Sequence, residues 1–141
     1  DRLGFENNEA GWVVGFAMEC YQRGILTKED FGGLEPNWGD IEAARAILRM
    51  IAHRRGVGDT LAEGVLRASA RLGDEARQIG VYTLKGNSPR GHDHRARWTE
   101  MLDTSVSNTG TIETSPPGPG DPGVATDQFD PDQVTTQVAV T

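Results

Sequence analysis

Cysteine and long apolar runs are scarce in this 141-residue sequence, which contains one cysteine and no apolar stretch of membrane-spanning length. A single cysteine cannot form an intrachain disulfide, and it cannot hold an iron–sulfur cluster unaided. A transmembrane helix needs about 20 predominantly apolar residues, so we expect no membrane span. The first residues also lack the basic and apolar regions of a secretory signal. Together these absences predict a reducing, cytoplasmic setting.

The sequence also contains fewer basic than acidic residues. It has 14 Lys and Arg residues and 21 Asp and Glu residues, which give a net charge of −7. Nonspecific nucleic-acid binding depends on Lys and Arg side chains that neutralise phosphates. The charge balance therefore argues against a nucleic-acid partner. The length of the chain allows one domain with a modest hydrophobic core.

Apolar residues at helical spacing predict a first helix over residues 8–23, with Gly24 as the terminating residue. The predicted buried face of this helix consists of Trp12, Val13, Phe16, Ala17 and Cys20. Because Cys20 lies within this apolar stripe, we interpret it as a small buried residue rather than a reactive thiol.

Capping signals predict the next two helices. Thr27 and Asp30 resemble a capping box that opens a short helix over residues 27–33. After a turn, Asp40 is expected to cap a helix that continues to Arg55 and is followed by Gly56. The predicted buried stripe of this helix contains Ile41, Ala44, Leu48 and Ile51.

A second capping-box pair, Thr60 and Glu63, predicts a fourth helix that stops at Gly73. Its apolar positions are Leu61, Val65, Ala68 and Leu72. Up to this point every predicted element is α-helical.

The character of the sequence changes after Ile79. Residues 81–98 combine extended propensity, turn residues and a basic run, and residues 98–108 return to a helical pattern. The segment 114–141 contains five prolines and four aspartates but no Lys or Arg. Such a composition buries too little apolar surface to fold alone. We therefore expect an all-α, multihelical domain over residues 1–113 and a poorly ordered linker or insertion over residues 114–141.

Residues 1–6, DRLGFE, place two acids and a glycine directly before the first predicted helix. Carboxylates only accept hydrogen bonds, so Asp1 and Glu6 suit a planar ligand edge with neighbouring N–H donors, such as that of a guanine or a pterin. Gly4 lets the backbone approach a ring closely. The alternative interpretation is a capping turn whose acids are exposed to solvent and favour the positive end of the helix.

Several stretches follow the acidic turn in a fixed order: GFAMECYQRGILT (15–27), NWGD (37–40), GVGDTLAEGVLRAS (56–69), LKGNSP (84–89), HDHRAR (92–97) and TSVSNTG (104–110). Together with DRLGFE they resemble the aldehyde:ferredoxin oxidoreductase family of tungsten enzymes over residues 1–113. The resemblance implies an internal, multihelical piece of a longer enzyme, of the type found in the carboxy-terminal part of that family.

In that family two pterin dithiolenes hold one tungsten or molybdenum, and a 4Fe-4S cluster exchanges electrons with ferredoxin or an electron-transfer subunit. The resemblance implies that Asp1, Gly4, Phe5 and Glu6 contact one pterin, although Glu6 stands where the family usually has Asp. The cysteine ligands of the cluster would lie in the remainder of the parent enzyme, and Cys20 is not one of them. No metal ligand is assigned within this chain.

The segment SPRGHDHRARW, residues 88–98, contains the second set of candidate residues. His92 and His94 share a face in an extended segment, and such a pair can begin a metal site, although a transition metal needs three or four ligands. A solvated basic loop is the alternative. As a wall of the pterin cavity, which the resemblance favours, the segment would bind an anionic substrate or a cofactor phosphate through Arg90, Arg95 or Arg97. A histidine would then move protons.

Glu113 stands near the position where aldehyde-oxidising members of the family carry a histidine close to the metal. One interpretation is an exposed glutamate before a proline-rich segment. Buried beside the cavity, it would have a raised pKa and act as a general acid. The sequence has no histidine at this position and contains the stretch GNSPRGHDHR. In both respects it resembles the tungsten subunit of class II benzoyl-coenzyme A reductases, which reduce an aromatic thioester ring.

The sequence therefore predicts a fragment of a tungsten (or molybdenum) pterin-dependent, iron–sulfur oxidoreductase. Its substrates would be of the aldehyde and carboxylate type or aromatic acyl-thioesters. We expect the isolated chain to be inactive and to bind no cofactor, because half of the cofactor cradle is missing. The alternative is a non-catalytic helical binding module whose basic loop contacts an acidic partner.

Overall fold

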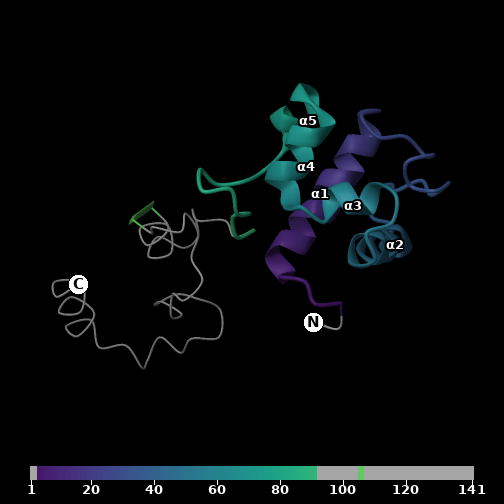
Figure 1. Ribbon diagram of the computed structural model, residues 1–141, viewed down its shortest axis with the longest axis horizontal. Helices are drawn as coiled ribbons and strands as arrows, with labels where there is room; N and C mark the ends of the chain where they lie inside the picture. Colours follow the sequence, from purple (N-terminus) through teal and green to yellow (C-terminus); the bar gives the residue numbers. More distant parts are fainter. Residues whose placement is uncertain (1–2, 92–104, 107–141) are drawn as a thin grey trace. The chain divides into compact units, whose positions relative to one another are not determined.

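The computed structural model describes residues 3–91 and 105–106. Figure 1 shows five helices in the first of these ranges: α1 (Asn7–Gln22), α2 (Ile41–Ala52), α3 (Val57–Leu61), α4 (Gly64–Leu72) and α5 (Asp74–Ile79). The described residues contain no strand, which confirms the predicted all-α class. No helix in this described part is long and apolar enough to cross a membrane.

The first helix forms where the sequence predicts it, within one residue at each end. The Glu6 carboxylate caps α1 by accepting hydrogen bonds from the backbone N–H groups of Asn8 (2.9 Å) and Glu9 (2.5 Å). At the other end Gly24 has a φ of +72°. Its N–H donates to the Tyr21 carbonyl and the N–H of Ile25 donates to the Cys20 carbonyl, the arrangement of a Schellman motif.

The short helix predicted over residues 27–33 is wrong. One of the two hydrogen bonds of a capping box does form, because the Asp30 carboxylate accepts from the Thr27 N–H at 2.7 Å. The same carboxylate also accepts from the Thr27 hydroxyl at 2.9 Å. The chain nevertheless makes only successive turns here. Gly32 and Gly33 both adopt positive φ, a conformation that cannot continue a right-handed helix.

The helix that follows is capped as predicted but ends earlier. The Asp40 carboxylate accepts from the N–H of Ala43 at 3.0 Å, which caps α2. The helix stops at Ala52 rather than Arg55, because Arg54 has a φ of +49° and Gly56 a φ of +54°. The predicted buried stripe is partly confirmed, because Ile51 is buried. Ile41 is 68% exposed, Ala44 and Leu48 are half-buried, and the other buried positions are Ala43 and Ile47.

The capping box predicted at Thr60 and Glu63 is also wrong. Thr60 lies inside the short helix α3, and Glu63 makes no side-chain cap on α4. The single helix predicted to stop at Gly73 is instead two helices separated at Ala62–Glu63. A further helix, α5, begins at Asp74 immediately after Gly73, and the sequence analysis did not predict it.

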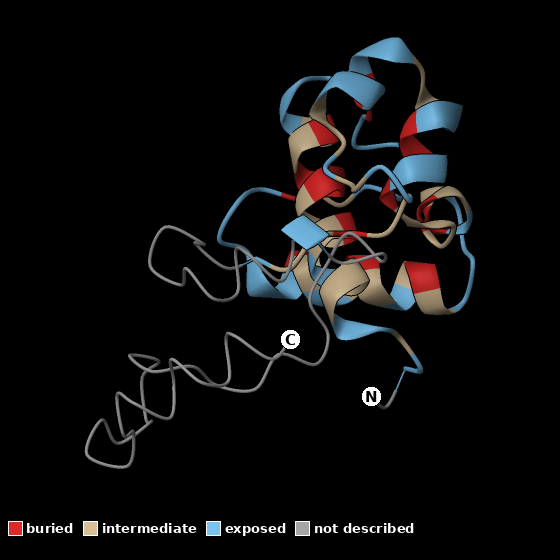
Figure 2. Cartoon of the chain, turned by 90° about the vertical axis from the view of Figure 1, so that its left-hand side faces the viewer, coloured by how far each residue is buried: buried red, intermediate tan, exposed pale blue. Residues whose placement is uncertain are grey.

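The hydrophobic core lies between α1 and the helices that contact it, α2, α4 and α5. Buried and exposed positions alternate along α2 and α4, as amphipathic helices require, whereas α1 is buried or half-buried at most of its positions. Figure 2 shows the buried positions of the helices turned toward one another. Tyr21 and Phe31 pack edge to face, with ring centroids 6.1 Å apart. The fully buried apolar residues of the helices are Val13, Phe16, Ala17, Met18, Cys20, Ala43, Ile47, Ile51, Leu61, Val65, Ala68 and Ala76.

Residues 1–91 form one compact unit and residues 92–141 form a second. Within the first unit, residues 80–91 leave α5 without forming a strand, and a turn brings the N–H of Thr83 to the carbonyl of Asn87 at 2.8 Å. In the second unit only Ser105 and Val106 are described, and both are helical. The predicted boundary between residues 113 and 114 lies outside the described residues.

Candidate functional site

The described part of the acidic turn consists of Leu3, Gly4, Phe5 and Glu6. Gly4 is exposed, has a φ of +75°, and meets no heavy atom within 4 Å of where a Cβ would stand. Phe5 is half-buried and packs against the core. The Glu6 carboxylate is exposed and caps α1. The capping role expected as the alternative for this turn is therefore present, and it occupies two of the roughly four lone-pair sites of a carboxylate.

A cavity of about 370 Å³ opens beside this turn. Its walls come from the turn, from α1 and from the region between α2 and α4, so residues distant in sequence meet there. Apolar side chains, including Val13, Ile51 and Leu61, form part of the lining. Glu6, Glu9 and Arg54 are its ionisable groups. A largely apolar hollow with a few polar groups suits a planar organic ligand that presents hydrogen-bonding edges.

The first turns of α1 also hold the beginning of the basic segment. The Asn8 side-chain amide donates to the carbonyl oxygens of Ser88 and Pro89, both at 3.0 Å. The indole N–H of Trp12 donates to the same Pro89 carbonyl. The acidic turn and the residues that precede Arg90 are therefore both bonded to the amino-terminal part of α1. None of the described residues of the basic segment lines the cavity, and residues 92–98 lie outside the described part of the chain.

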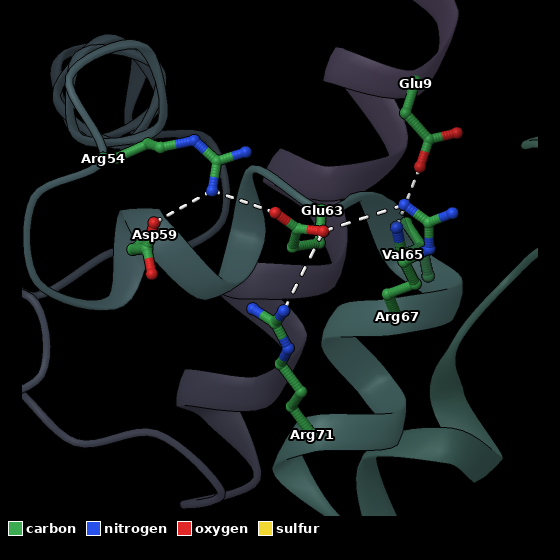
Figure 3. A network of polar contacts seen from close by, with 7 residues as sticks. All are labelled: Glu9, Arg54, Asp59, Glu63, Val65, Arg67 and Arg71. Carbon is green, nitrogen blue, oxygen red and sulfur yellow. Dashed lines mark hydrogen bonds and ion pairs between the residues drawn. The ribbon is translucent and has the colours of Figure 1, made fainter.

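Glu9 connects α1 to two other segments. Its carboxylate accepts from the N–H of Val65 at 2.8 Å and from the N–H of Ser88 at 3.1 Å. Figure 3 shows the Glu9 side chain pointing from α1 to the amino-terminal end of α4, where Val65 lies. Since the first N–H groups of a helix have no partner within the helix, Glu9 caps α4 from another part of the chain.

A charged network joins the turn after α2 to α3 and α4, next to this contact (Figure 3). Arg54 donates to Asp59 and to Glu63, both at 2.9 Å, and Arg67 and Arg71 approach Glu63 at 3.7 and 3.9 Å. Hydrogen bonds from Arg54, followed by the charges of the neighbouring arginines, lower the pKa of Glu63. The hydrogen bonds to Asp59 and Glu63 raise the pKa of Arg54. Glu63 therefore remains ionised at neutral pH.

Cys20 is fully buried in α1, which confirms its interpretation as a small core residue. Burial, and then the charge of Glu19, raise the pKa of its thiol to about 12. Among the residues that the structure describes, no three His, Cys, Asp or Glu side chains are grouped to hold a metal ion.

The remaining predicted site residues lie outside the described part of the chain: Asp1, His92, His94, Arg95 and Glu113. Two described residues at the cavity were missed by the sequence analysis, Glu9 and Arg54. Nothing in the local pattern identifies Glu9, because its partners lie 56 and 79 positions away. Arg54 belongs to a run of basic residues after α2, and its role depends on a backbone conformation that the sequence does not reveal.

Comparison with known proteins identifies what this arrangement is similar to. A family model described as "Aldehyde ferredoxin oxidoreductase, domains 2 & 3" matches residues 1–139. The "Aliphatic sulfonate oxidoreductase, WOR-like subunit" of Pyrococcus furiosus is 39% identical over 121 residues, which are 82% of this chain and 19% of that protein. A "Tungsten-containing aldehyde ferredoxin oxidoreductase" of Thermococcus kodakarensis is 33% identical over 94 residues, 64% of this chain and 16% of that protein.

The chain is also similar to a solved structure. The "Active site complex BamBC of Benzoyl Coenzyme A reductase in complex with 1,5 Dienoyl-CoA" superposes with a TM-score of 0.61 and 26% sequence identity. The similar region covers 77% of this chain and 16% of that one. The chain thus spans less than a fifth of the length of each of these three relatives.

Proposed function

Because this chain belongs to the aldehyde ferredoxin oxidoreductase family, we propose that it forms the pterin-contacting helical part of a longer tungsten (or molybdenum) oxidoreductase. The observation that carries the proposal is the cavity beside the acidic turn, at the position where the family resemblance expects a pterin. The relatives are named as oxidoreductases, two of them by an aldehyde or sulfonate substrate. The family membership and the multihelical fold predicted from the sequence are confirmed.

The described residues fit a pterin. The open backbone at Gly4 allows close approach of a ring, and the Glu6 carboxylate retains lone pairs beyond the two that cap α1. Phe5 and the apolar lining of the cavity exclude water from the face of a ring. In this proposal Asp1 and Glu6 accept hydrogen bonds from pterin N–H groups, and Gly4 and Phe5 shape the turn.

The metal that such a pterin carries would supply two-electron exchange between the substrate and a 4Fe-4S cluster held by the remainder of the enzyme. The chain itself would bind, orient and move protons. Arg95 would bind an anionic group of the cofactor or substrate. His92, His94 and Glu113 would hold or move the protons that accompany the electrons.

We propose ferredoxin or a dedicated electron-transfer subunit as the redox partner. The substrate class is either aldehydes and their carboxylates or aromatic acyl-thioesters. The structural similarity to the benzoyl-coenzyme A reductase complex supports the second class, and the aldehyde-oxidising relative supports the first. Assays of the full-length enzyme with both substrate classes, using a viologen dye as electron partner, would separate them.

The assignment of the acidic turn is tested in the full-length protein that contains this segment. We expect Asp1→Ala to lower both the tungsten content, measured by mass spectrometry, and the pterin content, measured by fluorescence after oxidative release. Asp40→Asn is the matched control, because Asp40 caps α2 and does not line the cavity. Full metal and pterin occupancy in the Asp1→Ala enzyme would remove the assigned role.

A further inference from the structure

Glu9 is the one side chain in the described ranges that bonds α1 to both α4 and the segment leading to Arg90. One carboxylate oxygen accepts from the N–H of Val65 and the other from the N–H of Ser88. Both partners are backbone groups of buried residues, so water cannot readily replace the carboxylate there. A neutral or shorter side chain could not satisfy both N–H groups at once.

The backbone makes room for this carboxylate. Gly64 has a φ of +81°, and a Cβ added to it would stand 2.8 Å from the Glu9 Oε1 atom. Any other residue at position 64 would therefore be strained and would also displace Glu9. The space beside α4 is thus matched to the Glu9 carboxylate.

Neighbouring side chains of α1 reinforce the same contact. Asn8 donates to the carbonyls of Ser88 and Pro89, and Trp12 donates to that of Pro89. We call Asn8, Glu9 and Trp12 the α1 clamp. It holds the N–H of residue 88 and the carbonyls of residues 88 and 89 at one end of α1.

The α1 clamp is itself fixed by the acidic turn. The Glu6 carboxylate accepts from the backbone N–H groups of Asn8 and Glu9, the two residues whose side chains hold Ser88. Glu6 also lines the cavity, as Glu9 does. A displacement of the clamp would therefore move the turn that carries Gly4 to Glu6 and the segment that carries Arg90 relative to each other.

We propose that Glu9 is a positioning residue for the cofactor site: its carboxylate fixes the backbone that carries Arg90 against the turn that carries Gly4 and Glu6. This inference rests on the proposed function, since it assigns the turn to a pterin. Glu9 acts through other residues, so it is not a catalytic residue. Its loss changes how the cofactor is held, rather than only how stable the helices are.

The test uses Glu9→Gln in the full-length protein, because glutamine has the same size but offers one acceptor oxygen and two donors. One of the two backbone N–H groups then loses its acceptor and faces a donor. We expect amide hydrogen exchange at Ser88 or Val65 to rise at least about tenfold, and cofactor retention on dialysis to fall about tenfold, the scale for loss of an outer-shell partner. The electron paramagnetic resonance spectrum of the metal that remains should shift.

Asp40→Asn is again the control, since the Asp40 carboxylate caps α2 through the N–H of Ala43 and lines no part of the cavity. We expect it to change neither the Ser88 exchange rate nor the metal spectrum, and to change the melting temperature little, because asparagine caps a helix about as well as aspartate. If Glu9→Gln does not fold, Asn8→Ala serves instead, because it removes two bonds to residues 88 and 89 and keeps the carboxylate. We expect the same changes from Asn8→Ala, smaller in size.

Two results would overturn the inference. The first is an unchanged exchange rate at both amides. The second is faster exchange accompanied by normal cofactor retention and an unshifted metal spectrum, which would leave Glu9 with a purely structural role. Asp1→Ala in parallel separates this failure from failure of the proposed function: loss of the cofactor in Asp1→Ala but not in Glu9→Gln contradicts only the positioning role. Retention in both contradicts the assignment of the turn.

Discussion

Gly58 lies directly against the backbone of Met50. A Cβ added to Gly58 would stand 2.3 Å from the Met50 carbonyl oxygen and 2.8 Å from the backbone N of Ile51. Only glycine allows α3 to approach α2 this closely. The approach closes the wall of the cavity where Ile51 and Leu61 line it.

We expect Gly58→Ala to destabilise the chain by about 2 kcal/mol, the order of an overpacked core position, because rigid backbone atoms rather than a flexible side chain occupy the space. Urea unfolding of the 141-residue chain measures this. Gly11→Ala is the matched control: Gly11 lies inside α1 at ordinary φ and meets nothing within 4 Å. Removal of a helix-interior glycine should stabilise the chain by about 0.5–1 kcal/mol. Similar unfolding midpoints for the two variants would contradict the close approach.

Glu63 should make stability depend on pH in the acidic range. Its folded-state pKa lies below its ordinary value of 4.5, chiefly because Arg54 donates a hydrogen bond to it. A carboxylate with a depressed pKa stabilises the fold above the unfolded-state pKa and loses that contribution as the pH falls through the folded-state pKa. Glu63→Gln should therefore melt at a lower temperature than the parent chain at pH 7, and the gap should close below about pH 4.5.

Glu42→Gln is the control for this titration. Glu42 pairs with Arg45 on the exposed side of α2, where both side chains are more than half exposed, and such pairs contribute little. Its melting temperature should follow that of the parent chain at every pH. A Glu63→Gln deficit that persists unchanged at pH 3 would show that the network does not act through charge.

Cys20 should be unreactive in the folded chain. With a pKa of about 12, roughly one thiol in ten thousand is ionised at pH 8, and the thiolate is the reactive form. Iodoacetamide at pH 8 should leave Cys20 unmodified in the native chain and should alkylate it in urea. Mass spectrometry measures both. Rapid alkylation without denaturant would mean that α1 separates easily from its neighbours.

Glu113 remains a prediction from the sequence, because it lies outside the described residues. If it donates a proton during the reaction, Glu113→Gln in the full-length enzyme should lower kcat by about 100-fold while the metal content stays normal. The acidic limb of the pH–rate profile should change as well. Equal rates for the Glu113→Gln enzyme and the parent enzyme would contradict a role for Glu113 in the reaction.

The sequence pattern predicted the helix ends that are fixed by hydrogen bonds between residues close in sequence. Asp40 caps α2 through Ala43, three positions away, and Gly24 ends α1 through the carbonyls just before it. Both interactions are contained within a few residues, so the sequence pattern alone identifies them. The identity of the family was also predictable, because its motifs occur in order along the chain.

The start of α4 could not be predicted in this way. The sequence suggested Thr60 and Glu63 as a capping pair, but the N–H of Val65 is capped by Glu9, 56 positions earlier. Thr27 and Asp30 form one of the two hydrogen bonds of the predicted capping box, but no helix follows, because Gly32 and Gly33 adopt positive φ. At the candidate site, DRLGFE identified the turn itself. The contribution of Glu9 and Arg54 emerges only when distant segments are brought together.

The bonds from Asn8 to the carbonyls of residues 88 and 89 span 80 and 81 positions of the chain. During synthesis α1 leaves the ribosome before residues 88 and 89, so these bonds cannot form until Pro89 has emerged. The contacts of α1 are thus completed only after the other helices of residues 1–91 have been synthesised, and closure of so long a loop makes folding of residues 1–91 slow compared with a bundle of purely local contacts. Translation that stops before position 88 would release a chain in which Asn8 and Trp12 lack their partners and Glu9 keeps only Val65. This truncated form would be a target for chaperones and proteases.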